Sequence, residues 1–111
     1  MKEETEKYLT DIDMCIARIE KHISNCKSYP DFEENITVVK AIEREFEIIG
    51  EALRKMRDIE PNIAISSYKK IIGLRNLIAH AYDLVEASQL WGIIINHLPK
   101  LKSEVDQLLK K

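Results

Sequence analysis

Apolar residues recur at every third or fourth position through most of the chain, a spacing typical of one buried face of an α-helix. The first such run predicts a helix over about residues 3–24. Its apolar face carries Leu9, Ile12, Ile16, Ile19, Ile23 and Cys26. No run shows the strict alternation of a half-buried strand, so the pattern predicts helices throughout.

A second run predicts one long helix over about residues 31–58, which would span the whole domain. Its apolar face carries Phe32, Ile36, Val39, Ile42, Phe46, Ile49, Leu53 and Met56. Pro30 separates the two helices because proline cannot continue a helix interior. Asp31 is suited to cap the second helix, since its carboxylate can accept a hydrogen bond from a free backbone N–H.

The remaining sequence predicts a third helix that ends at about Tyr82 and a last helical region beyond it. Ser66 or Ser67 is suited to be the N-cap of the third helix. In the last region the helical period continues through Pro99, whose ring removes the hydrogen bond to the Ile95 carbonyl. We therefore expect a kink or a short break near Pro99. Together these runs predict an all-α fold, an antiparallel bundle of four to five helices.

The 111 residues, 45% hydrophobic and 32% charged, suffice for one domain with a single core, so we expect residues 1–111 to form one helical domain. Cys15 and Cys26 are too far apart for a zinc motif and are interpreted as free thiols on helix faces. The N-terminus lacks the features of a signal peptide, and no apolar run reaches the length of a membrane span. We expect a cytoplasmic protein without a membrane partner.

The net charge of −2 means that the field of the whole molecule does not attract nucleic acid. Binding of RNA would need a local basic patch. The candidates are Arg54, Lys55, Arg57, Lys69, Lys70, Arg75, Lys100 and Lys102. The alternative for each of them is a solvated helix face or a cation near a helix C-terminus.

Chemically versatile side chains concentrate at the end of the third predicted helix. With Arg75 set at 0° on a helical wheel, Asn76 lies near 100° and His80 near 140°, so these three share one arc. The opposite side, between roughly 200° and 300°, is apolar. Leu74, Leu77, Ile78 and Ala81 occupy it. This helix therefore has a face typical of an active site and an apolar back for the core.

Arg75, His80 and Tyr82 form the pattern R-x-x-x-x-H-x-Y, and two further stretches accompany it. These are I-I-G-E-A at residues 48–52 and a W…L-P-x-L ending at residues 91–101. With these features the chain resembles the HepT-like branch of the HEPN ribonucleases, over roughly Phe32 to Leu109. It departs from the family where members often carry an I-P-W-type segment before the motif helix; here residues 63–68 read I-A-I-S-S-Y.

The resemblance implies more than a fold. Proteins of this family are the toxins of type VII-like toxin–antitoxin systems, and they act as homodimers whose motifs face each other across the interface. Their antitoxin is a minimal nucleotidyltransferase of the MntA type, which silences the toxin by adding AMP to the motif tyrosine, here Tyr82. An AMP group would add negative charge and bulk beside Arg75 and would compete with RNA phosphate.

The residues themselves suit metal-independent cleavage of RNA, and tRNA is one candidate substrate. Histidine, which titrates at about pH 6.5 when unperturbed, can take a proton from a 2′-hydroxyl, which then attacks the adjacent phosphorus. Arg75 would stabilise the negative charge on the phosphoryl oxygens, and Asn76 would fix His80 or contact the phosphate. This chemistry needs no cofactor. It favours two histidines, which a symmetric dimer would supply by bringing two copies of His80 into one cleft.

Three glutamates, Glu43, Glu47 and Glu51, stack on the second predicted helix. Bundles that hold two metal ions combine such glutamates with Glu-x-x-His, and no histidine here has a glutamate three residues before it. We therefore expect no metal. Glu51 is interpreted either as a group that orients Arg75 or His80, or as a surface glutamate. Gly50 costs about 1 kcal/mol relative to alanine in mid-helix, so close helix packing would be a reason for it.

Two alternatives to a ribonuclease stay open. The chain could be a non-catalytic helical module that binds a nucleotidyltransferase partner or the nucleic acid on which that partner acts. A purely structural bundle would leave the cluster of Arg75, Asn76 and His80 unexplained. The apolar run at residues 93–95 is wider than one core needs, which fits either a dimer interface or a fully buried helix.

Overall fold

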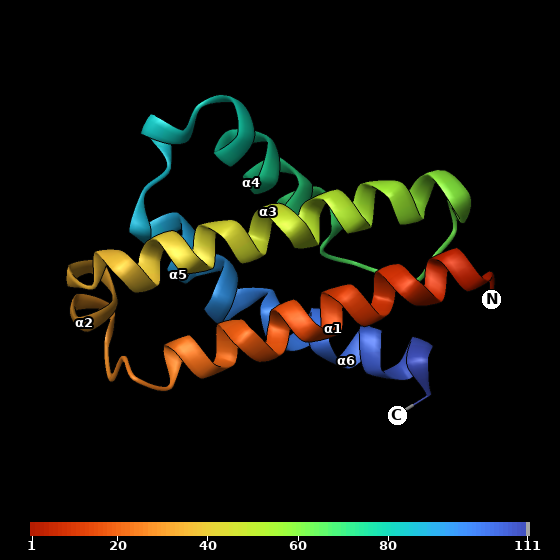
Figure 1. The fold of residues 1–111 in the computed structure, drawn as a ribbon, viewed down its shortest axis with the longest axis horizontal. Coiled ribbons are helices and arrows are strands. Elements are labelled where there is room, and N and C mark those ends of the chain that lie inside the picture. The colour runs from red at the N-terminus through yellow and green to blue at the C-terminus, as the bar shows by residue number, and fades with distance from the viewer. Residues whose placement is uncertain (111) are drawn as a thin grey trace.

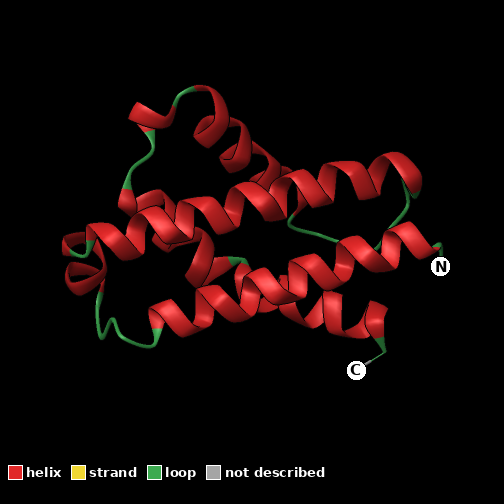
Figure 2. Ribbon diagram, viewed as in Figure 1, coloured by secondary structure: helices red, strands yellow, loops and turns green. Residues whose placement is uncertain are grey.

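The computed structural model describes residues 1–110, with the side chain of Tyr82 left out, and this part of the chain is helical with no strand (Figure 2). Its elements are α1 (Glu3–Ile23), α2 (Tyr29–Glu34), α3 (Ile36–Ile59), α4 (Tyr68–His80), the 3₁₀ turn η1 (Tyr82–Leu84), α5 (Ala87–Asn96) and α6 (Leu98–Leu109). The predicted all-α bundle is confirmed, but the described residues form six α-helices where four to five were predicted.

The two longest helices form the frame of the bundle. Helices α1 and α3 pack side by side and run in opposite directions along the long axis of the molecule, which measures 41 × 30 × 19 Å (Figure 1). Helix α6 packs against α1, and α5 contacts α2, α3 and α6. Helix α4 packs mainly on α3, on the side away from α1 (Figure 1). The motif helix is therefore mounted on the frame rather than enclosed by it.

The predicted apolar face of α1 is the face that the core buries. Leu9, Ile12 and Ile19 are fully buried there, opposite Phe46 and Ile49 of α3 in the same apolar cluster. Burying a side chain of this size contributes about 1.5–3 kcal/mol, so the α1–α3 contact supplies a large share of the stability.

The prediction of one helix over residues 31–58 is wrong, because the chain breaks at Asn35. The Asn35 backbone leaves the helical region (φ −90°, ψ 83°), and its side-chain oxygen accepts a hydrogen bond from Val38 N at 3.1 Å, which caps α3. Helix α2 also begins before Asp31. Ser28 is its N-cap, and Pro30 lies in its first turn, where the missing N–H breaks no intrahelical bond.

The expected break near Pro99 is confirmed. Helix α5 ends at Asn96 and α6 begins at Leu98, so Pro99 lies in the first turn of α6. Helix α5 is not fully buried: Ile94 is buried, but Ile95 is 54% exposed. The apolar run of α5 thus leaves surface that the described part of the chain does not cover, and one of the two explanations for this run, a fully buried helix, is wrong.

Both cysteines are free and buried, as predicted. Burial, together with the hydrogen bond and charge of Glu45, raises the pKa of the Cys15 thiol to about 12, although Arg18 opposes this effect. Arg18 Nε lies 2.9 Å from a Glu45 oxygen and so joins α1 to α3. The Cys15 thiol is consequently neutral and unreactive. None of the described helices combines the length and apolar character that spanning a bilayer requires.

Candidate active site

Helix α4 carries the three residues of the predicted catalytic face. Its predicted apolar back is confirmed for Leu74 and Ile78, which are buried, whereas Leu77 is half-buried and Ala81 lies beyond the end of the helix. Asn76 and His80 are exposed, whereas Arg75 is half-buried with 21% of its side chain accessible. The face is therefore divided, because α3 covers the side on which Arg75 lies and leaves the other side open.

Arg75 meets Glu51 of α3. Arg75 Nη2 lies 2.7 Å from Glu51 Oε2, and Arg54 Nη2 donates a hydrogen bond of 2.5 Å to the other oxygen of the same carboxylate. The hydrogen bond from Arg54 lowers the pKa of the Glu51 carboxyl below its usual value, and the charges of Arg54, Arg75 and Lys55 add to this against the opposing effect of burial. Glu51 is thus a carboxylate at neutral pH, placed where it can orient Arg75.

The guanidinium of Arg75 is only partly satisfied. Nη1 donates a hydrogen bond of 3.1 Å to Asn76 Oδ1. Nε is buried and has no hydrogen-bond partner among the described residues, and the contact with Glu51 Oε2 is an ion pair without hydrogen-bond geometry. A buried donor without a partner is costly, and such groups often mark functional sites.

Gly50 makes this close approach possible. A Cβ atom built on Gly50 would lie 2.6 Å from Arg75 Cγ and closer still to Arg75 Cβ, a separation that real side chains do not tolerate. The reason suggested for Gly50, close packing with the motif helix, is confirmed. The crossing of α3 and α4 therefore fixes the base of the Arg75 side chain.

A cleft of about 350 Å³ opens beside this crossing, between α1, α3 and α4. Arg75, Glu51 and Lys55 form part of its wall, with Tyr8 and Asp11 of α1 opposite. The wall carries three cations and three carboxylates, so the cleft offers hydrogen bonds of both kinds to a polar ligand. His80 does not line it.

His80 lies apart from Arg75. It is the last residue of α4, its side chain is exposed, and within residues 1–110 it makes no hydrogen bond or ion pair with Arg75, Asn76 or Glu51. Figure 1 shows that this end of α4 and the following η1 project from the body of the bundle. The backbone of Tyr82 belongs to η1, but the side chain lies outside the described residues. One chain alone does not bring the predicted catalytic pair together.

The three stacked glutamates of α3 are each engaged with a cation of the same helix. Glu43 pairs with Lys40 at 3.1 Å, and Glu47 pairs with Arg44 at 3.0 Å, as Glu51 does with Arg54. In the part of the chain that the structure describes, no group of three or more histidine, cysteine or acidic residues is placed to hold a metal ion.

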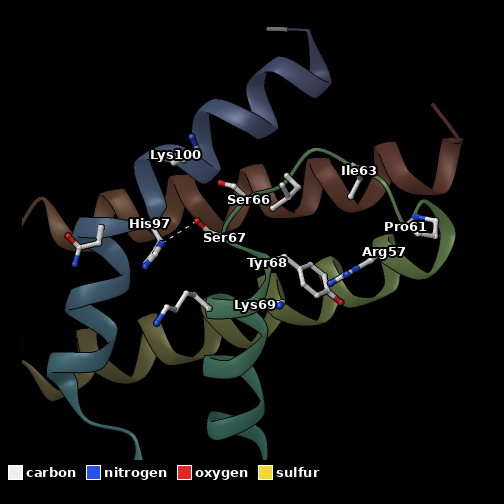
Figure 3. A pocket seen from close by; sticks show the side chains of 12 residues that line it. Arg57, Pro61, Ile63, Ser66, Ser67, Tyr68, Lys69, His97 and Lys100 are labelled. Atoms are coloured by element: carbon white, nitrogen blue, oxygen red, sulfur yellow. Dashed lines mark hydrogen bonds between the residues drawn. The ribbon is translucent and has the colours of Figure 1, made fainter.

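The predicted basic patch is divided by the fold. Three of its candidates, Arg54, Lys55 and Arg75, surround Glu51, and Lys102 pairs with Glu20 at 3.0 Å. The other four candidates line a second, larger cavity of about 590 Å³ at the start of α4 (Figure 3). They are Arg57, Lys69, Lys70 and Lys100.

The sequence did not identify Ser67 and His97 as candidate functional residues at that cavity. Ser67 is the N-cap of α4 by position, as predicted, but its hydroxyl does not cap the helix. It shares a hydrogen bond of 3.2 Å with Nδ1 of His97 instead. The two residues are thirty positions apart, so the only signal available was the unusual I-S-S-Y segment in place of the I-P-W type.

Known proteins resemble this chain along most of its length. The profile of the family described as "Ribonuclease HepT-like" matches residues 12–108. A Methanocaldococcus jannaschii protein named as a candidate RNase is 37% identical over 82 residues, which are 70% of this chain and 72% of that protein. A candidate RNase of Caldanaerobacter subterraneus is 29% identical over 85 residues, or 76% of each chain.

A further relative extends over the full length. A Thermococcus cleftensis protein named as a candidate ribonuclease HepT is 29% identical over 114 residues, which are 99% of this chain and 100% of the relative. No solved structure gives a significant match. The family match includes α3, with Gly50 and Glu51, and the whole of α4, so it covers the crossing at which Arg75 is held. The chain therefore belongs to the HepT-like family of ribonucleases, as its sequence motifs predicted.

Proposed function

We propose that this chain is a metal-independent endoribonuclease in which Arg75 and His80 are catalytic and Asn76 and Glu51 support them. The main observation behind the proposal is the way in which the Arg75 side chain is held. The residue is fixed by the α3–α4 crossing at Gly50 and by the Glu51 carboxylate 2.7 Å away, while His80 on the same helix is exposed. A held cation and an accessible histidine suit stabilisation of a phosphoryl group and transfer of a proton, respectively.

The reaction proceeds in one displacement. One His80 removes the proton of an RNA 2′-hydroxyl, and the oxygen attacks the adjacent phosphorus while the bond from phosphorus to the 5′-oxygen breaks. A second His80 donates a proton to that leaving oxygen. Arg75 stabilises the negative charge on the non-bridging oxygens. The products carry a 2′,3′-cyclic phosphate and a 5′-hydroxyl.

A symmetric homodimer would supply the second histidine. The case for it rests on three features of the described residues: His80 forms no hydrogen bond or ion pair with Arg75, the end of α4 projects from the bundle, and Ile95 on α5 is exposed. A twofold interface would place two copies of α4 against each other and cover apolar surface at the same time. We expect light scattering to give the mass of a dimer.

Cleavage of a bulk tRNA pool in EDTA tests the mechanism. We expect His80→Ala to lower the rate by a factor of about 10²–10⁴, the usual contribution of a general acid–base group. His22→Ala, which changes a histidine of α1, is the matched control and should leave the rate unchanged. Products with 3′-hydroxyl ends, or cleavage that a chelator abolishes, would contradict the proposal.

We further propose that the chain is the toxin of a toxin–antitoxin pair and that a nucleotidyltransferase of the MntA type silences it by adding AMP to Tyr82. The support is the R-x-x-x-x-H-x-Y motif, which puts Tyr82 two residues beyond His80, the last residue of α4. Intact mass after incubation with that enzyme and ATP should rise by whole AMP units. Tyr82→Phe should not change in mass; modification that persists in this variant would place the AMP elsewhere.

One observation favours a second candidate, a non-catalytic module that binds the nucleotidyltransferase or its nucleic acid. In the single chain Arg75 is already paired with Glu51. If the purified dimer leaves RNA intact yet forms a complex with the nucleotidyltransferase, and if Arg75→Ala weakens that complex, the module is the better description. Growth arrest on expression that depends on His80 would favour the ribonuclease.

A further inference from the structure

The cavity at the start of α4 lies at the other end of this helix from His80. It has a volume of about 590 Å³ and is lined by the first turns of α4 and α6, the end of α3 and the segment before α4 (Figure 3). Ile63 and Ile65 give it an apolar wall, and Ser66 and Ser67 add two hydroxyl groups. It is larger than the cleft beside Arg75, and the proposed chemistry uses none of its residues.

The charge of this cavity is positive and unbalanced. Arg57, Lys69, Lys70 and Lys100 all line it, and within residues 1–110 none of the four forms an ion pair. No acidic residue is among the lining residues. The chain as a whole has a net charge of −2, so this concentration of positive charge is local. A concave site with charges of one sign attracts and concentrates the opposite ion.

Arg57 is fixed without being neutralised. Its guanidinium lies over the ring of Tyr68, 4.2 Å from the ring centre. A contact of this type holds the side chain in place while its N–H donors and its charge stay available. Figure 3 shows Arg57 and Tyr68 at one side of the cavity, with Lys69 below and Lys100 across from them on α6.

Two helix N-termini also meet at this cavity. Ser67 is the N-cap position of α4 and His97 is that of α6, and neither side chain caps its own helix. They bind each other instead, through the 3.2 Å contact between Ser67 Oγ and His97 Nδ1. The first backbone N–H groups of α4, and those of α6 except at Pro99, which has no N–H, are therefore left without a side-chain cap, and the dipoles of both helices add partial positive charge.

One carboxylate lies next to the cavity but not in its wall. Glu104 of α6 accepts hydrogen bonds from Ser66 N at 3.0 Å and from Ser66 Oγ at 3.3 Å. It does not line the cavity. Its effect is to hold Ser66, and with it the chain that leads into Ser67 and α4, against α6.

We infer that this cavity is a binding site for a phosphate group, and that in the proposed ribonuclease it holds a backbone phosphate of the RNA away from the bond that is cut. Four unpaired cations and two uncapped helix N-termini are the recognised means of binding phosphate. The assignment to RNA rests on the proposed function; the assignment to phosphate does not. Helix α4 has 13 residues and is about 20 Å long, so one RNA strand could contact the cavity and His80 together.

Binding of a short fluorescein-labelled single-stranded RNA, followed by anisotropy, tests the inference. All proteins carry His80→Ala, so that the RNA stays intact and the result does not depend on catalysis. The test variant is Lys69→Gln with Lys100→Gln. The matched control is Lys21→Gln with Lys27→Gln, two exposed lysines outside the cavity that form no ion pair in the described residues and give the same change in net charge.

We expect the test variant to bind RNA about five- to tenfold more weakly and the control to bind within twofold of the parent. The slope of the logarithm of the RNA-binding constant against the logarithm of the salt concentration should also become shallower. For a single strand the change is about 0.7 for each RNA phosphate that the variant no longer binds. Equal weakening in both variants would mean diffuse charge and would overturn the site. Unchanged binding in the test variant would overturn its assignment to RNA.

Inorganic phosphate separates the two possible sources of the group. Titration followed by amide NMR should shift the backbone signals of Ser67, Lys69 and Lys100, and the shifts should be absent in the test variant. If phosphate shifts these signals but the test variant binds RNA normally, the cavity is a phosphate site whose ligand is a free phosphate. If phosphate shifts none of these signals, the site is overturned, whether or not the enzyme cleaves RNA.

Discussion

The cations of helix α4 have opposite surroundings at its crossing with α3 and at its start. At the crossing, Arg75 is half-buried, packed on Gly50 and paired with Glu51. At the start, Lys69 and Lys70 are exposed, border an open cavity and form no ion pair in the described residues. Both regions lie on one helix of 13 residues, so sequence neighbourhood does not account for the difference.

The comparison shows how one fold can place cations for two different tasks. A guanidinium that must stay at a fixed position benefits from a carboxylate that orients it. A lysine that must attract and release an external anion benefits from having no internal partner. On this view the crossing fixes catalytic geometry and the start of α4 captures substrate.

The strongest test of the crossing is Gly50→Ala. The added methyl group would overlap atoms close to the Arg75 backbone, and overpacking of this kind typically costs about 1–3 kcal/mol. Alanine gains about 1 kcal/mol in helix propensity, so we expect a net loss of up to about 2 kcal/mol in the free energy of unfolding, measured in urea.

Gly73→Ala and Gly92→Ala are the matched controls, because a Cβ atom at either position meets no atom within 4 Å. We expect each of them to stabilise the protein by about 0.5–1 kcal/mol. If Gly50→Ala behaved like these controls, the crossing would be loose and Arg75 would not be fixed by it.

At the start of α4, Ser67→Ala tests whether the Ser67–His97 contact joins two helices. Ser67 is only 6% exposed, and loss of its hydrogen bond should lower the free energy of unfolding by about 1 kcal/mol. The exposed serine of α6, Ser103, provides the control Ser103→Ala, for which we expect no loss. A Ser67→Ala variant as stable as the control would mean that the contact contributes nothing.

The smallest effect should come from Glu51→Gln. Arg54, Arg75 and Lys55 lower the pKa of the Glu51 carboxyl in the folded state. The ionised carboxyl therefore stabilises the fold fully above the unfolded pKa of about 4.5, and this stabilisation is lost as the pH falls through the lower pKa of the folded state. We expect the variant to be less stable by under about 1 kcal/mol at neutral pH.

The pH dependence sharpens this test. The difference in unfolding free energy between the parent and Glu51→Gln should shrink as the pH falls below about 4.5 and should stay constant above it. The rate of RNA cleavage at neutral pH should fall severalfold, because Arg75 loses the group that orients it. A variant with full activity would limit Glu51 to a role in stability.

Much of the fold followed from local pattern. The helix predicted for residues 3–24 is α1, and the predicted break near Pro99 separates α5 from α6. The division at Asn35 was missed because the apolar spacing from Phe32 to Ile36 continues across it as if the helix were unbroken. A side-chain cap at Asn35 outweighs that periodicity, and periodicity alone does not show which of the two prevails.

The site was predicted less completely than the fold. The wheel placed Arg75, Asn76 and His80 on one arc, but packing on α3 half-buries Arg75 and leaves the other two exposed. A wheel describes directions around one helix and contains no information about where a neighbouring helix lies.

Most of the helices, their apolar faces and the family could be read from the sequence, because each depends on residues three or four apart or on a motif of fixed order. Which side chains pair between helices followed only from the packing of those helices. Glu51 meets Arg75, and Ser67 meets His97, across helices that are far apart in sequence. Such contacts depend on the crossing angle and rotation of packed helices, which side chains from the whole core set together.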